Sequence, residues 1–130
     1  MSPDLTYLLY SVVLCFVQVL IAAAGANSQV GLPKLAGNRE GLPDIVGWAG
    51  RARRAHLNMI ENLVLFAALV LIAAAAGKAN ATTATGAMIF FWGRLAYTVI
   101  YLIGIPWLRT LAWFVAVVGM AMITWVLLQA

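Results

Sequence analysis

Charged side chains are scarce in this chain of 130 residues, which holds eight Lys and Arg residues and only four Asp and Glu residues. Charged residues make up 9% of the sequence and hydrophobic residues 65%, and the mean hydropathy is +0.98. So little charge excludes an ordinary soluble core and indicates a polytopic membrane protein.

Cysteine and histidine are almost absent, with one residue of each. Cys15 has no CxxC partner and no nearby cation, so we expect a packed apolar side chain. His56 has no second His, Cys or carboxylate at ligand spacing on its face, so no metal site is expected. The N-terminal residues 1–6 have no basic segment but include Asp4, which predicts a retained helix and no cleaved signal.

Four long apolar runs are present, and each is long enough to cross about 30 Å of hydrocarbon as a helix. The expected fold is all-α, an integral membrane four-helix bundle that forms a single transmembrane domain over residues 1–130. The predicted helices span about residues 5–26, 48–77, 86–105 and 108–129.

The first connection, residues 27–44, is the only long one and is rich in Gly and Pro. The second, residues 77–86, is expected to be a plain turn, and the third, residues 106–110, is very short. Six of the eight basic residues lie in or beside the first and third connections: Lys34, Arg39, Arg51, Arg53, Arg54 and Arg109. The positive-inside rule therefore predicts that these connections are cytoplasmic and that both termini lie outside. We read the basic excess as topological and see no nucleic-acid signal in it.

A polar stripe precedes and enters the second apolar run. Arg51, Arg54, Asn58 and Glu61 are spaced three or four residues apart, which places them on one face of a helix. Guanidinium, amide and carboxylate groups in this order suit a zwitterionic ligand. A polar clamp between membrane helices explains the same spacing equally well. Glu61 lies inside the apolar run, where a pairing or functional role is the default hypothesis.

A second constellation lies in the third run, where Arg94, Tyr97 and Tyr101 share one helix face. Arg94 is about 18 Å along the helix from Pro106, too far for its side chain to reach the cytoplasmic surface easily. Because Glu61 is the only carboxylate well inside an apolar run, we predict a structural ion pair between Glu61 and Arg94. The Tyr97 and Tyr101 hydroxyls are candidate ligand donors, although simple aromatic packing fits Tyr101 equally well.

The segments RARRAHLNMIENL and GRLAYTVIYLIGIPWLR resemble the membrane-associated proteins in eicosanoid and glutathione metabolism, the MAPEG family. The resemblance covers the second helix through the start of the fourth. It implies a homotrimer of four-helix subunits in which glutathione binds between neighbouring subunits near the cytosolic face.

Carried onto this chain, the resemblance implies roles for individual residues. Arg54, Asn58 and Glu61 would hold the polar ends of glutathione, and Tyr97 and Tyr101 would line the cleft. The Arg109 guanidinium would lie beside the sulfur of glutathione, and the Thr110 hydroxyl is a possible second donor to that sulfur. A cationic neighbour lowers the pKa of a thiol and populates the nucleophilic thiolate. The implied function is a membrane-bound glutathione transferase or peroxidase that acts on a lipophilic electrophile or hydroperoxide.

The chain also departs from the pattern of the characterised enzymes. Leu57 replaces an arginine, Trp113 stands near a common tyrosine position, and Gly31 and Pro33 lie where a basic residue is frequent. These differences predict a weaker hold on glutathione and a closer resemblance to the little-characterised bacterial branch, in an inner membrane. A non-catalytic scaffold or a protein that binds lipids or small ligands is the alternative on the same fold. A small transporter is disfavoured because no broken helix pair or inverted repeat is found.

Overall fold

The computed structural model describes all residues from Met1 to Ala130 and contains five helices and no strand. They are α1 (Pro3–Val30), α2 (Leu32–Ala36), α3 (Gly47–Ala75), α4 (Ala81–Ile103) and α5 (Pro106–Leu128). All but α2 are long and apolar enough to cross a membrane. The prediction of an all-α four-helix membrane bundle is therefore confirmed.

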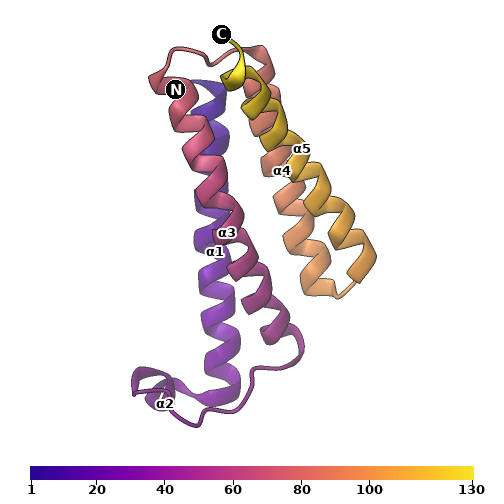
Figure 1. Cartoon of the computed structure of the whole chain (residues 1–130). Coiled ribbons are helices and arrows are strands. Elements are labelled where there is room, and N and C mark those ends of the chain that lie inside the picture. Colours follow the sequence, from indigo (N-terminus) through magenta and orange to yellow (C-terminus); the bar gives the residue numbers. More distant parts are fainter.

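The four long helices form two pairs, α1 with α3 and α4 with α5 (Figure 1). Both chain termini and the connection between α3 and α4 lie at one end of the bundle. The connection that contains α2 and the turn between α4 and α5 lie toward the other end, where the two pairs diverge (Figure 1). The basic connections are thus at the same end, as the alternation of four antiparallel helices requires.

Local sequence explains where the helices begin. Ser2 caps α1, because its hydroxyl accepts a hydrogen bond from the Leu5 backbone N–H at 3.3 Å, and Pro3 follows at the first helical position. Asn80 and Thr83 form a capping box at the start of α4. Pro106 begins α5 two residues after Gly104, whose φ of +94° is a left-handed conformation that reverses the chain tightly.

The connections differ from the sequence-based prediction. The helix α1 continues to Val30, and the short helix α2 interrupts the first connection, which was expected to be one long loop. Residues 81–86, expected in a plain turn, are already helical because the Asn80 capping box starts α4 earlier. The third connection is also shorter than expected, since residues 106–110 form the first turns of α5.

The larger apolar core joins side chains of all four long helices, including Leu14 of α1 and Met120 of α5. Phe66 of α3 stacks on Phe90 of α4 with ring centroids 3.9 Å apart, and both are fully buried. Helices α4 and α5 approach closely because Gly86 and Gly119 face each other. A Cβ atom built on Gly86 would lie 2.6 Å from the Gly119 carbonyl oxygen. Small residues at membrane helix contacts permit such close packing.

Candidate functional site

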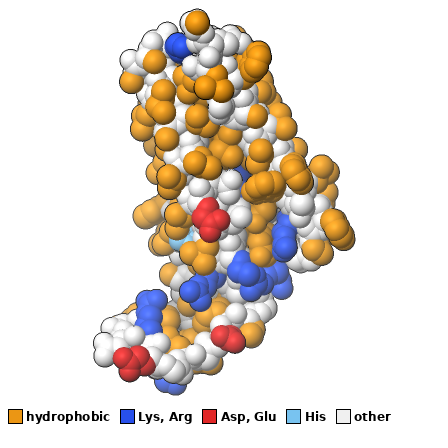
Figure 2. Space-filling model, viewed as in Figure 1, with side chains coloured by type: hydrophobic (Ala, Val, Ile, Leu, Met, Phe, Trp, Pro, Cys, Tyr) orange, Lys and Arg blue, Asp and Glu red, His pale blue; other side chains and the backbone are white.

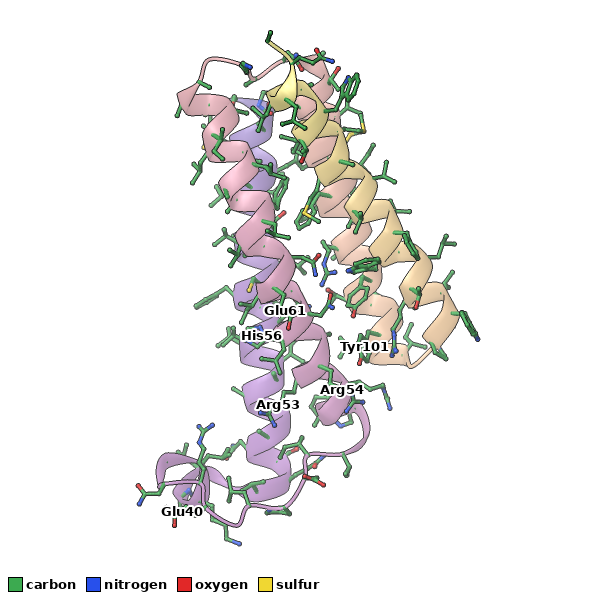
Figure 3. All side chains as sticks on the ribbon, viewed as in Figure 1. Glu40, Arg53, Arg54, His56, Glu61 and Tyr101 are labelled. Carbon is green, nitrogen blue, oxygen red and sulfur yellow. The ribbon has the colours of Figure 1, made fainter.

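Three of the residues predicted to bind or activate a ligand meet at the end of the bundle that holds the basic connections. Arg54 of α3 donates a hydrogen bond from Nε to the Tyr101 hydroxyl at 3.0 Å. The Arg109 guanidinium of α5 lies over the Tyr101 ring, 4.3 Å from its centroid, in a cation–π contact. Figure 3 shows Arg54 and Tyr101 on facing helices at this level. We call Arg54, Tyr101 and Arg109 the arginine–tyrosine cluster.

The turn between α4 and α5 positions this cluster. Tyr101 lies in the last turn of α4 and Arg109 in the first turn of α5, so the two-residue connection keeps them together. Arg51 of α3 reaches the same turn and donates from Nε to the Leu102 carbonyl at 3.1 Å. A Cβ atom on Gly104 would lie 3.4 Å from Arg51 Nε, an ordinary contact, so the positive φ of Gly104 and not a lack of space favours glycine there.

A second layer lies deeper in the bundle and centres on Arg94, which is fully buried. Its Nη1 donates to the Asn58 side-chain oxygen at 2.8 Å, and its guanidinium lies 4.2 Å from the centroid of the Tyr97 ring. Arg94 Nε and Nη2 have no hydrogen-bond partner. The Tyr97 ring meets the Tyr101 ring edge-on with centroids 5.5 Å apart. The aromatic pair therefore joins the buried Arg94 to the arginine–tyrosine cluster.

The predicted ion pair between Glu61 and Arg94 is not present in the chain. The only hydrogen-bond partner of the Arg94 guanidinium is Asn58, and Glu61 is exposed on the surface of the helical body (Figure 3). The exposed carboxylate of Glu61 stays outside the buried layer, and Asn58, three residues earlier on α3, supplies the acceptor for Arg94 instead.

The sequence interpretation missed two buried polar residues beside this layer. Gln18 of α1 donates to the Thr98 hydroxyl at 2.8 Å, and Thr98 donates to the Arg94 carbonyl at 2.9 Å. Asn62 donates to the Asn58 side-chain oxygen at 3.2 Å. Gln18 interrupts an apolar run in the sequence, and this was the available signal. The network ties α1, α3 and α4 together. The polar stripe on α3 can therefore act both as a clamp between helices and as a face that binds a ligand, so the two explanations are not mutually exclusive.

Thr110, the predicted second donor to a sulfur atom, follows Arg109 in the first turn of α5. Its hydroxyl donates to the Pro106 carbonyl four residues earlier at 3.3 Å. This long bond is a common local arrangement of threonine in helices. The hydroxyl must rotate away from the Pro106 carbonyl before it can donate to a ligand.

An apolar groove of about 580 Å³ opens between α3 and α5. Leu65, Leu69, Val117 and Met120 are among its lining residues, and Thr124 is the only polar one. Val117 is eight residues after Arg109, which is about 12 Å along α5. The groove therefore begins a short distance along the bundle from the arginine–tyrosine cluster. No group of three or more His, Cys, Asp or Glu side chains gathers where a metal ion could bind.

The fold and this site define a class: an integral, multi-pass membrane protein of four helices with a strongly cationic polar site at one end. The model of the MAPEG family matches residues 5–129, and the chain belongs to that family. No curated protein matches the chain. Membership supports a glutathione-related role of the transferase or peroxidase type in a membrane.

Proposed function

We propose that the protein is a glutathione-dependent transferase or peroxidase in which the arginine–tyrosine cluster ionises the thiol. The observation that supports this most strongly is that Arg54 and Arg109 approach one tyrosine from different helices. The Tyr101 hydroxyl accepts a hydrogen bond from Arg54 and keeps its own proton to donate. Two cations and a hydroxyl donor at one place favour a negatively charged ligand atom.

The charges of the site fit glutathione, which carries two carboxylates and one amine. Arg51, Arg54, Arg94 and Arg109 supply four guanidinium groups, against the single carboxylate of Glu61. Two buried nitrogens of Arg94 are donors without an acceptor. Because an unpaired buried donor is costly, an anionic ligand that reaches them relieves that cost. In the proposal, Arg54, Asn58 and Glu61 hold the polar ends of the tripeptide, and Tyr97 and Tyr101 line the cleft.

Arg109 acts on the sulfur in this proposal. Its guanidinium favours the thiolate over the thiol, and the Thr110 hydroxyl donates a second hydrogen bond to the same atom. When bound, glutathione supplies a thiol that attacks a lipophilic electrophile or reduces a lipid hydroperoxide. The groove between α3 and α5 is an apolar surface along which such a substrate can approach.

The homotrimer is part of the same proposal. Glu61 is the fifteenth residue of the 29-residue helix α3 and is exposed on the surface of the single chain. A carboxylate in the middle of a membrane helix is unfavourable against lipid, so another protein surface is expected to cover it. The family resemblance gives three as the number of subunits. In the same proposal, the protein lies in a bacterial inner membrane with its basic connections on the cytoplasmic side.

Calorimetric titration of glutathione into the purified protein tests the proposed ligand. We expect binding to weaken at least tenfold in Arg54→Ala, because a charge-assisted hydrogen bond contributes about 1.5–3 kcal/mol. Arg53→Ala is the matched control, since Arg53 is the preceding residue of α3 and lies outside the cluster. Absence of binding by the unaltered protein at millimolar glutathione would leave a non-catalytic family scaffold or another ligand.

A further inference from the structure

A pocket outside the arginine–tyrosine cluster lies where α1 ends and α2 folds back beside it. It has a volume of about 370 Å³. One wall is formed by Ala22, Ala23 and Ala26 of α1, and another by apolar side chains of α2. Arg39 and Arg53 are its only charged lining residues. An apolar trough with two cations and no carboxylate has the chemistry of a site for an amphiphilic anion.

Both arginines have guanidinium N–H donors that remain free for a ligand. Arg39 Nε donates to the Leu35 carbonyl at 2.7 Å, which holds the side chain back against α2. This bond leaves the two terminal nitrogens of its guanidinium for another acceptor. Arg53 is exposed and extends from α3 beside the lower part of α1 (Figure 3). A second cavity of about 300 Å³ shares both arginines and also has Asp44 on its wall, so we assign the anion to the first.

The position of the pocket along α1 corresponds to the surface of the membrane. The helix α1 has 28 residues and is about 42 Å long, which exceeds the hydrocarbon thickness of about 30 Å. Its last turns, which carry the alanines, therefore reach the headgroup layer. Figure 2 shows several Lys and Arg side chains gathered near this level, between the apolar helical body and the connection that contains α2.

From this geometry we propose that the pocket binds one anionic phospholipid. Arg39 and Arg53 hold its phosphate, and the start of an acyl chain lies along the alanines of α1. Above these alanines the exposed side chains of α1, including Phe16 and Leu20, continue an apolar surface into the hydrocarbon. This lipid site does not depend on the proposed glutathione chemistry, because it uses none of the residues of the arginine–tyrosine cluster.

Native mass spectrometry of the purified protein tests the charge of the site. The protein is incubated with equal amounts of phosphatidylglycerol and phosphatidylcholine that have the same acyl chains. We expect preferential retention of phosphatidylglycerol, and a preference lowered about fivefold by either Arg39→Gln or Arg53→Gln. Lys34→Gln removes the same charge from α2, but Lys34 does not line this pocket, so it should change the preference less than twofold.

A second pair of variants tests the apolar wall. Ala23→Leu fills the pocket and should reduce retention of phosphatidylglycerol, while Ala24→Leu places the same side chain on an exposed neighbouring position outside the pocket. Circular dichroism and gel filtration report whether the arginine variants fold. If they do not fold, this pair of alanine variants tests whether the pocket binds the lipid.

Three results would overturn the proposal. Equal losses in Lys34→Gln and Arg53→Gln would indicate diffuse attraction to the membrane surface. Equal retention by Ala23→Leu and Ala24→Leu would show that no acyl chain uses the trough. Complete displacement of the lipid by excess inorganic phosphate would mean that the arginines bind a soluble anion.

Discussion

Arg94 is fully buried, yet only one of its three guanidinium nitrogens has a hydrogen-bond partner. The partner, Asn58, is itself held by Asn62. A buried charge that loses its partner is costly, whereas replacement of both members by apolar residues can be nearly neutral. The contact between Asn58 and Arg94 is therefore expected to be strongly coupled.

A double-mutant cycle measures this coupling. We expect Asn58→Leu alone to lower the free energy of unfolding in detergent by about 2 kcal/mol, because it leaves all of the Arg94 guanidinium without an acceptor. In an Arg94→Met background, the same change should cost much less. Additive effects of the two substitutions would contradict the contact between Asn58 of α3 and Arg94 of α4.

At the residue scale, the sequence identified most of the groups that meet but not all of their partners. Spacing placed Tyr97 and Tyr101 on one face of α4, and both are buried there. The predicted ion pair between Glu61 and Arg94 was wrong because we chose the partner of Arg94 by charge complementarity alone. The buried residues Ala55, Met59 and Asn62 mark the interior face of α3, and Glu61 lies well away from it.

At the scale of helices, α4 and α5 approach each other closely at Gly86 and Gly119. The neighbouring atom that a Cβ on Gly86 would meet, at 2.6 Å, is a backbone carbonyl oxygen, which cannot move aside as a flexible side chain can. The packing of these two helices therefore depends on the absence of a side chain.

Gly86→Val tests this contact. We expect it to lower the free energy of unfolding by about 1–3 kcal/mol, since overpacking forces the two helices apart. Thr85→Val, at the exposed neighbouring position, should have an effect of less than about 0.5 kcal/mol. Thermal unfolding in detergent measures both. An equally small effect of the two changes would show that α4 and α5 do not approach at Gly86.

The presence of the four long helices was predictable from the sequence, but the residues at which several of them begin or end were not. Apolar runs of spanning length identify the four long helices because the bilayer requires about 20 residues. The polar residues after Gly77 were interpreted as a turn, yet two of them, Asn80 and Thr83, form the capping box of α4. The short helix α2 lacks the length and periodicity that a sequence pattern needs.

For the whole molecule, charge asymmetry sets the expected orientation. Six of the eight basic residues lie at the end that holds α2 and the turn between α4 and α5, and Lys78 lies at the other end with both termini. The positive-inside rule then predicts that the arginine–tyrosine cluster lies on the cytoplasmic side, where the proposed ligand glutathione would reach it.

Single-cysteine labelling tests this orientation in intact cells. In a Cys15→Ala background, Lys78→Cys should react with a membrane-impermeant maleimide added outside. Lys34→Cys, in α2, should react only after permeabilisation. The opposite pattern of labelling would place the cluster outside and would contradict the proposed orientation.

The most direct test of the proposed function is the thiolate absorbance of glutathione bound to the purified protein, followed as a function of pH. A free thiol has a pKa of about 8.5, and an adjacent cation lowers it. We expect bound glutathione to ionise below about pH 7.5. In Arg109→Ala the thiol pKa should return toward the free value, whereas in Arg53→Ala it should remain low. A thiol pKa that is the same in the unaltered protein and in Arg109→Ala would contradict the assignment of Arg109 as the residue that activates the sulfur.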